Sequence, residues 1–195
     1  MKRDPMSAAI FLADGFEDSE GLITIDMFRR ARVQIDTISM NADLTVHTSH
    51  NITLLADRTY KDTDLDAYDI LILPGGKRGT KNLEACASLK DALIKHFKEG
   101  RWTCAICAAP SIFGHLGILQ GKKYTCFPEF DDDYGGLYQN ELAVKDGNVI
   151  TARGMGATVE FARMILAEII DPDMMRKLEY GMQYEHTFRT LKKPE

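Results

Sequence analysis

The sequence predicts an α/β protein with a mostly parallel sheet and helices on both faces. Short apolar runs of strand length alternate along the chain with longer segments of helical periodicity. The runs Ala8–Leu12 and Asp69–Leu73 are almost continuously apolar, as in strands that are buried on both faces. The chain has 195 residues, which is enough for one full domain. We therefore expect a single domain over 1–195, with a core at about 7–170 and a helical tail at 173–195.

The first half of the chain is predicted to hold three strands of the sheet and two helices. The acidic stretch Glu17–Glu20 is typical of a helix start, and Gly100 is typical of a helix end. Residues 41–66 are less regular. The expected strands are Ala8–Leu12, Val33–Ser39 and Asp69–Leu73, with short β pieces at Leu44–His47 and Ile52–Leu55 and helices at Glu17–Ala31 and Asn82–Glu99.

The second half continues the alternation with shorter elements. Asp146-Gly147-Asn148 is typical of a hairpin turn, and Asp171-Pro172 is typical of a helix end. The expected elements are a strand that ends at Cys107, a helix to about His115, a short strand at Lys123–Cys126, a loop at Pro128–Tyr138, hairpin strands at Leu142–Lys145 and Val149–Thr151, and helices at Ala157–Ile170 and Asp173–Lys192.

Cys107 is the candidate nucleophile. An apolar run ends at this residue, and small residues with Pro110 follow before a helical pattern resumes, which predicts a sharp turn from strand to helix. Such a turn exposes the side chain beside the first backbone N–H groups of the helix, and these groups with the helix dipole favour a thiolate. The alternative is a small buried core thiol.

Three unusual stretches fall at the carboxyl ends of predicted parallel strands, where ligands bind in such sheets. They are Asp14–Glu20, Pro74–Gly76 and Cys107. Backbone N–H groups stabilise the oxyanion that forms when a thiolate attacks a carbonyl, and a carboxyl group near the sulfur can shuttle protons. The candidate amide donors are Gly75, Gly76 and Ala108, and the candidate acids are Glu17, Asp18 and Glu20.

Composition and charge exclude several classes of protein. The net charge of −5 gives no basic surface for nucleic acid, and no stretch approaches the roughly 20 apolar residues of a membrane span. Cys104 and Cys107 form a C-x-x-C, but no second such pair supports a zinc site. We expect a soluble, cytoplasmic protein without structural disulfides, a metal or a membrane partner.

The five histidines do not provide a base for Cys107. His115 is eight residues further along the chain, about two helical turns from the sulfur. His47 and His50 form an H-x-x-H without further predicted ligands, so we do not assign a metal to them. A Cys–His–acid triad is therefore not predicted from this chain alone.

Four motifs together resemble the ThiJ/PfpI superfamily, in its DJ-one/YajL-like branch. They occur in the order and at the spacing of that family, from about Ala8 to Ile170. The motifs are Leu12-Ala13-Asp14-Gly15-Phe16-Glu17-Asp18-Ser19-Glu20, Leu73-Pro74-Gly75-Gly76, Ala105-Ile106-Cys107-Ala108-Ala109-Pro110 and Thr151-Ala152-Arg153-Gly154-Met155-Gly156-Ala157-Thr158.

The resemblance implies a flavodoxin-like three-layer sandwich, usually a homodimer, with an oxidisable nucleophile at Cys107. It implies that Glu20 hydrogen-bonds this cysteine in protonated form, that Glu17 is a second acid of the pocket, and that Gly75, Gly76 and Ala108 form the oxyanion site. Arg153 and Arg30 match arginines of the pocket rim and the dimer contact. No cofactor is implied.

The chain departs from the family pattern at three positions. Ala108 follows the nucleophile where the protease-like branch has a histidine, which argues against a peptidase. Phe127 stands where human-type members have a histidine, so a mechanism that requires that histidine is not supported here. Met155 replaces the proline of a Gly-Pro-Gly turn, and we interpret this as a packing change.

The resemblance implies a cofactor-free enzyme that acts on reactive aldehydes, a glyoxalase or a deglycase of proteins and nucleotides. The alternative is a non-enzymatic redox sensor or chaperone in which Cys107 is oxidised to a sulfinic acid and held by Glu20. A third hypothesis, a peptidase or amidotransferase, requires a histidine from elsewhere, such as a partner subunit. The first two hypotheses use the same two residues, so the sequence does not separate them.

Overall fold

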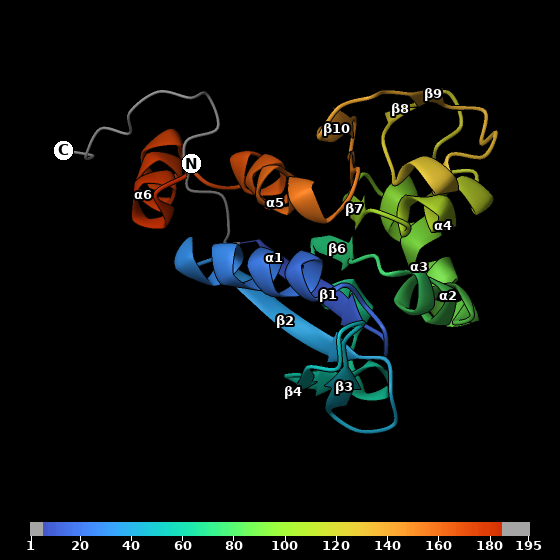
Figure 1. Cartoon of the computed structure of the whole chain (residues 1–195), viewed down its shortest axis with the longest axis horizontal. Coiled ribbons are helices and arrows are strands. Elements are labelled where there is room, and N and C mark those ends of the chain that lie inside the picture. The colour runs from blue at the N-terminus through green and yellow to red at the C-terminus, as the bar shows by residue number, and fades with distance from the viewer. Residues whose placement is uncertain (1–5, 185–195) are drawn as a thin grey trace.

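A seven-stranded sheet runs through the computed structural model, which describes residues 6–184 (Figure 1). The strand order is β10-β11-β7-β6-β1-β2-β5, and every neighbouring pair is parallel except β10 with β11. The strands are β1 (Ser7–Leu12), β2 (Gln34–Ser39), β5 (Arg58–Thr59), β6 (Ile70–Leu73), β7 (Trp102–Ile106), β10 (Ala143–Asp146) and β11 (Val149–Ala152).

Helices cover both faces of this sheet because its central strands are apolar on both sides. In β1, Ile10 and Leu12 pack into a core shared with α1, α5 and α6, while Ala9 and Phe11 pack into a second core shared with α2, α3 and α4. The predicted sheet class, with helices on both faces, is confirmed. The helices are α1 (Asp18–Arg30), α2 (Lys77–Glu84), α3 (Ala87–Lys98), α4 (Pro110–His115), α5 (Thr158–Ala167) and α6 (Pro172–Met182).

A small hairpin lies beside the start of α1. Its strands β3 (Thr45–His47) and β4 (Thr53–Leu55) pair antiparallel, close to the two β pieces predicted there. The N–H of Gly15 donates to the carbonyl of His47 (2.7 Å), and the N–H of Ser49 donates to the carbonyl of Phe16 (2.8 Å). These bonds hold the turn of the hairpin against the turn that precedes α1.

The predicted helix at Asn82–Glu99 is wrong at its start and in its middle. The structure has two helices, and Cys86 between them is extended, with φ −86° and ψ 101°. The first helix begins at Lys77, directly after Gly76, whose φ of +86° lets the chain turn from β6 into a helix. This early start brings the basic residues of α2 to the same end of the sheet as the Pro74–Gly76 turn.

In the segment between β7 and the β10–β11 hairpin, the strands lie at other positions than predicted. The strand predicted at Lys123–Cys126 is only β8 (Lys123–Tyr124), which pairs with β9 (Leu137–Tyr138) inside the predicted loop. A short 3₁₀ turn occupies Pro128–Phe130. The predicted hairpin around Gly147 is confirmed as β10 and β11.

The last helix is shorter than predicted. Asp171 caps α6 by accepting from the N–H of Met174, and the helix ends at Met182, where Gln183 is left-handed with φ +53°. The remainder of the helix predicted to Lys192 lies outside the described residues.

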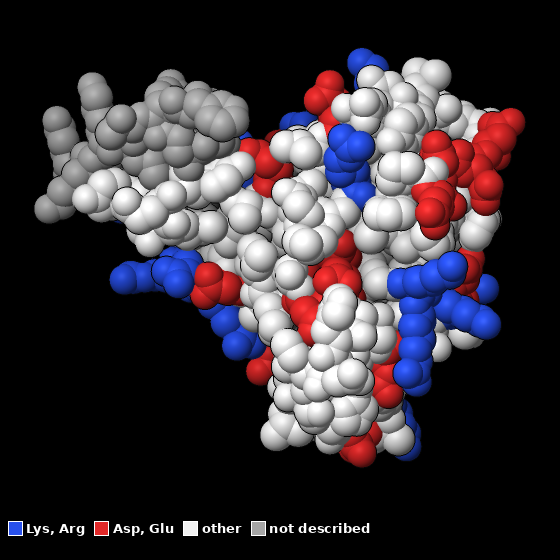
Figure 2. Space-filling model, viewed as in Figure 1, with Lys and Arg blue, Asp and Glu red and all other residues white. Residues whose placement is uncertain are grey.

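The described surface carries charges of both signs. On the face in Figure 2, Lys and Arg atoms form separate groups with Asp and Glu atoms between them, so this face has no continuous basic area. None of the helices between residues 6 and 184 is long and apolar enough to cross a bilayer.

Candidate active site

Cys107 lies on a strained turn between β7 and α4. Its φ is +65°, a left-handed conformation that is uncommon for a residue with a side chain. Two hydrogen bonds fix this backbone: the N–H of Cys107 donates to the carbonyl of Ala152 (2.9 Å), and its carbonyl accepts from the N–H of Phe127 (2.8 Å). Strain that neighbouring segments hold in this way is typical of functional turns, and here it presents a half-buried thiol at the carboxyl end of the sheet.

Glu20 reaches the same place from the first turn of α1. It is fully buried, and its Oε2 accepts from the N–H of Gly75 (2.7 Å). Its Oε1 has no hydrogen-bond partner among the described residues. A Cβ on Gly75 would lie 2.6 Å from Cys107 Cβ and 2.7 Å from Glu20 Oε2. Gly75 therefore lies between the acid and the nucleophile, where a side chain would clash with both.

The burial of Glu20 favours its neutral form. Burial raises the pKa of Glu20 to about 7, and the negative charge of Glu17 acts in the same direction, while the N–H of Gly75 and the thiol of Cys107 oppose the shift. At neutral pH this carboxyl group is therefore poised to accept or donate a proton. The resemblance implied a protonated Glu20 beside the cysteine, and the environment of the carboxyl group has that effect.

The sequence-based expectation of a stabilised thiolate is wrong for the resting site. Burial and the neighbouring charge of Glu20 raise the pKa of the Cys107 thiol to about 12. The N–H groups of Gly76 and Ala108 lower this pKa, as expected, but by less. A proton on Glu20 removes its charge as a cause of the shift, while burial, the largest cause, remains.

The three predicted oxyanion donors differ in their hydrogen-bond partners. The N–H of Gly75 is already bonded to Glu20, whereas those of Gly76 and Ala108 face the sulfur. A Cβ on Gly76 would lie 2.5 Å from the carbonyl oxygen of Gly15, which explains why a glycine is required there. Two amides, rather than three, are therefore available to a developing oxyanion.

We expect the buried Glu20 to make the stability of the protein depend on pH. Its folded pKa of about 7 exceeds the ordinary value of 4.5, so ionisation opposes folding as pH rises from 4.5 through 7. The full cost above pH 7 is about 3 kcal/mol. Glu20→Gln should therefore raise the free energy of unfolding in urea by up to that amount at pH 8, and much less at pH 5. An equal effect at both pH values would contradict this account.

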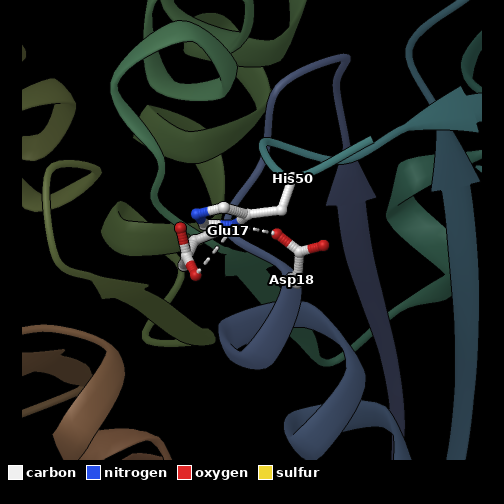
Figure 3. A group of neighbouring side chains, drawn as sticks. All are labelled: Glu17, Asp18 and His50. Atoms are coloured by element: carbon white, nitrogen blue, oxygen red, sulfur yellow. Dashed lines mark hydrogen bonds and ion pairs between the residues drawn. The ribbon is translucent and has the colours of Figure 1, made fainter. Parts of the chain in front are cut away.

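Glu17, Asp18 and His50 form a network at the N-terminal end of α1 (Figure 3). Ser49 Oγ donates to Glu17 Oε2 (3.0 Å) and lies 2.8 Å from Asp18 Oδ2. His50 Nδ1 lies 2.7 Å from Asp18 Oδ2 and 3.8 Å from Glu17 Oε1. The hairpin β3–β4 therefore binds both acids, and Glu17 faces the hairpin as well as the neighbourhood of Glu20.

Within this network, the pKa of Asp18 is lowered and the pKa of His50 is raised. Burial acts to raise the pKa of Asp18, but hydrogen bonds from Thr48, His50 and Ser49 outweigh it and lower the pKa well below its ordinary value. The hydrogen bond to Asp18 and the charge of Glu17 raise the pKa of His50. Sequence analysis did not predict that His50 contacts these two acids, because this contact depends on where the hairpin folds.

The same three residues are the one group among the described residues that could hold a metal ion. One ligand atom of each lies within 4.8 Å of the others. However, each ligand atom already has a partner within the network, and His47 of the H-x-x-H contacts Thr53 Oγ1 (3.0 Å) and not this group. The network is complete as a set of hydrogen bonds and ion pairs.

The two arginines taken from the resemblance lie in different places. Arg153 is half-buried and directly precedes Gly154, at which a Cβ would lie 4.0 Å from Cys107 Sγ. Arg30 is ten residues after Glu20 on α1, about 15 Å along the helix, and pairs with Asp26 (2.6 Å). Arg30 is therefore not at the rim of the Cys107 pocket.

Met155, which replaces the proline of the Gly-Pro-Gly turn, lies at the surface of the described chain. Met155 is 57% exposed and directly follows Gly154.

Phe127 is also exposed, at 40%, and its backbone N–H donates to the carbonyl of Cys107. The other three cysteines are free thiols, two of them deeply buried: Cys86, Cys104 and Cys126.

A mostly parallel α/β sheet that presents a cysteine on the turn after a central strand, close to a buried acid from the first helix, defines a class of α/β proteins with a cysteine at the carboxyl end of the sheet. The comparisons with known proteins narrow this class. The profile of the DJ-1/PfpI family matches residues 6–168. The chain therefore belongs to the DJ-1/PfpI family.

Relatives and solved structures agree with this assignment. Protein dj-1beta of Drosophila melanogaster is 31% identical over 179 residues, which cover 90% of this chain and 96% of the relative. The crystal structure of Drosophila DJ-1beta matches with a TM-score of 0.88 at 30% identity, over 94% of this chain and all of that chain. The glutathione-independent glyoxalase DJ-1 of Schizosaccharomyces pombe is 26% identical over 200 residues, covering 97% of this chain and all of the relative.

Proposed function

We propose that this protein is a cofactor-independent glyoxalase that converts small 2-oxoaldehydes such as methylglyoxal to 2-hydroxy acids, with deglycation of protein or nucleotide adducts as a related activity. The observation that carries the proposal is the pairing of Cys107 with a buried Glu20 across Gly75. The similarity to a relative named as a glutathione-independent glyoxalase supports it.

The first step is attack of the Cys107 sulfur on the aldehyde carbon. The ionised form of Glu20 takes the thiol proton as the C–S bond forms, and the N–H groups of Gly76 and Ala108 stabilise the negative charge on the aldehyde oxygen. Glu20 then gives the proton to this oxygen, which leaves a neutral hemithioacetal and a carboxylate at Glu20.

The second step moves a proton between the two substrate carbons. The Glu20 carboxylate removes the hydrogen on the aldehyde carbon to form an enediolate, the hydroxyl proton of the hemithioacetal passes to the former keto oxygen, and protonated Glu20 gives its proton to the neighbouring carbon. The product on the sulfur is a thioester of the hydroxy acid. Water then cleaves the thioester, releasing lactate from methylglyoxal and restoring the thiol. A pKa near 7 for Glu20 suits it to both directions of this transfer.

The experiment that tests this proposal follows methylglyoxal loss and lactate formation without glutathione or added metal. Wild-type protein should form lactate, and Cys107→Ala should reduce the rate to that of the uncatalysed reaction. Cys104→Ala, a buried cysteine outside the site, is the matched control for loss of a thiol. Equal rates for wild type and Cys107→Ala would sink the proposal.

The redox-sensor hypothesis has its own supporting observation. Cys107 is half-buried, so its sulfur is open to small oxidants, and the amides of Gly76 and Ala108 would bind the oxygens of a sulfinate. If the lactate assay fails, peroxide titration followed by intact mass should show two added oxygen atoms on wild type and none on Cys107→Ala.

A further inference from the structure

Exposed apolar side chains gather on the segments that border Cys107. Phe127 is 40% exposed, Leu142 49% and Met155 57%. The three segments meet through backbone bonds: the carbonyl of Leu142 accepts from the N–H of Arg153 (3.0 Å), and the carbonyl of Cys107 accepts from the N–H of Phe127 (2.8 Å). Large exposed apolar groups that adjoin a reactive centre indicate a binding surface.

The Phe127 ring lies at the edge of the space above the sulfur. A Cβ on Gly154 would lie 3.6 Å from Phe127 Cδ2 and 4.0 Å from Cys107 Sγ, with no heavy atom closer than the ring. Because Gly154 has no side chain, the ring and the sulfur border the same space. The ring also packs edge-on against Phe130, with centroids 6.4 Å apart, which fixes its orientation.

The sulfur therefore has two chemically different surroundings. The carboxyl group of Glu20 and the amides of Gly76 and Ala108 form a polar side, where an aldehyde oxygen and the migrating proton are handled. Phe127, whose ring borders the same space at Gly154 as the sulfur, forms an apolar side. A 2-oxoaldehyde that places its aldehyde on the polar side directs the substituent of its keto group to the apolar side.

We infer that Phe127 binds this substituent, so that the protein prefers 2-oxoaldehydes with an aromatic or branched alkyl group to methylglyoxal. The preference rests on the proposed function for its chemistry, but the apolar surface itself does not. An aromatic substituent covers the Phe127 ring and removes apolar area from water, which a methyl group does only in part. Hydrophobic pockets discriminate substrates of this kind by roughly 10- to 100-fold.

The kinetic test compares phenylglyoxal with methylglyoxal as substrates, measuring mandelate and lactate. Wild type should have the higher kcat/KM for phenylglyoxal. The phenylglyoxal-to-methylglyoxal ratio of kcat/KM should fall about 10-fold in Phe127→Ala and remain close to wild type in Phe127→Leu, which keeps an apolar side chain. Leu55→Ala, which removes an exposed side chain of β4, should leave the ratio unchanged. A ratio that is the same in wild type and Phe127→Ala would overturn the inference.

A second readout separates this inference from the proposed function. N-phenylmaleimide and N-methylmaleimide alkylate a thiol without enzymatic turnover, and peptide mapping distinguishes Cys107 from the half-buried Cys86. The ratio of the two alkylation rates at Cys107 should fall in Phe127→Ala. A lower alkylation ratio in Phe127→Ala, together with no lactate formation, would contradict the proposed glyoxalase activity and support the apolar binding surface. Equal ratios in wild type and Phe127→Ala would mean that no apolar binding surface adjoins the sulfur, for example because a second copy of the chain covers it.

Discussion

Glu20→Gln is expected to lower the rate of lactate formation from methylglyoxal by about 10²- to 10⁴-fold, the usual contribution of a general acid–base group. Glutamine keeps a side-chain oxygen for the N–H of Gly75, which donates to Glu20 Oε2 over 2.7 Å in the wild type, so the position of the loop should be preserved. It cannot take a proton from the thiol or from the substrate carbon. The loss should therefore appear in kcat more than in KM.

The matched control for this change is Glu17→Gln, at the acid that faces Ser49 and His50. Because Glu17 acts on Glu20 only through its charge, its loss should lower activity far less than the loss of Glu20. A Glu20→Gln variant with at least a tenth of the wild-type kcat would contradict the assignment of the proton shuttle.

Gly75→Ala is expected to damage both activity and stability. The new methyl group would lie 2.6 Å from Cys107 Cβ, 2.7 Å from Glu20 Oε2 and 2.8 Å from the carbonyl oxygen of Ile106, and two of these groups form the reactive pair. Relief of the clash must separate the acid from the sulfur, and a displacement of about 1 Å costs roughly 10²-fold in rate. Overpacking should lower the free energy of unfolding by about 1–3 kcal/mol.

Gly181→Ala is the matched control for this substitution. Gly181 lies within α6, and a Cβ there meets no atom within 4 Å, so alanine should stabilise the helix by about 0.5–1 kcal/mol. Its activity should equal that of wild type. The measurements are urea unfolding and kcat/KM for methylglyoxal on both variants. A Gly75→Ala protein with wild-type kinetics would show that the tight contact between Cys107 and Glu20 is not needed.

The sheet was predictable because its central strands stand out in the sequence as short apolar runs. A strand such as β6, which is buried on both faces, is an unbroken apolar run in the sequence, and the hairpin turn at Gly147 has a local sequence preference. The break between α2 and α3 was not predictable, because Ala85 favours a helix and Cys86 does not oppose one strongly. Tertiary contacts decide such a position.

The residues of the site were predictable from the sequence, but the pKa of Cys107 was not. Three strand ends were expected to converge, and the structure brings Glu20, Gly75 and Cys107 into contact. The pKa of Cys107 was expected to be low because only the amides beside it are visible in the sequence. The burial that raises it depends on packing between distant segments, as does the bond that removes the Gly75 amide from the oxyanion donors.

The most direct test of a Cys107–Glu20 glyoxalase is the isotopic composition of lactate that the wild-type protein forms from methylglyoxal in D₂O. Because the proton on the Glu20 carboxyl exchanges with solvent, we expect lactate with deuterium on its second carbon, formed at a rate that Cys107→Ala abolishes. Lactate formed at an undiminished rate by Glu20→Gln would contradict the proton shuttle, and lactate formed equally by Cys107→Ala would contradict the nucleophile.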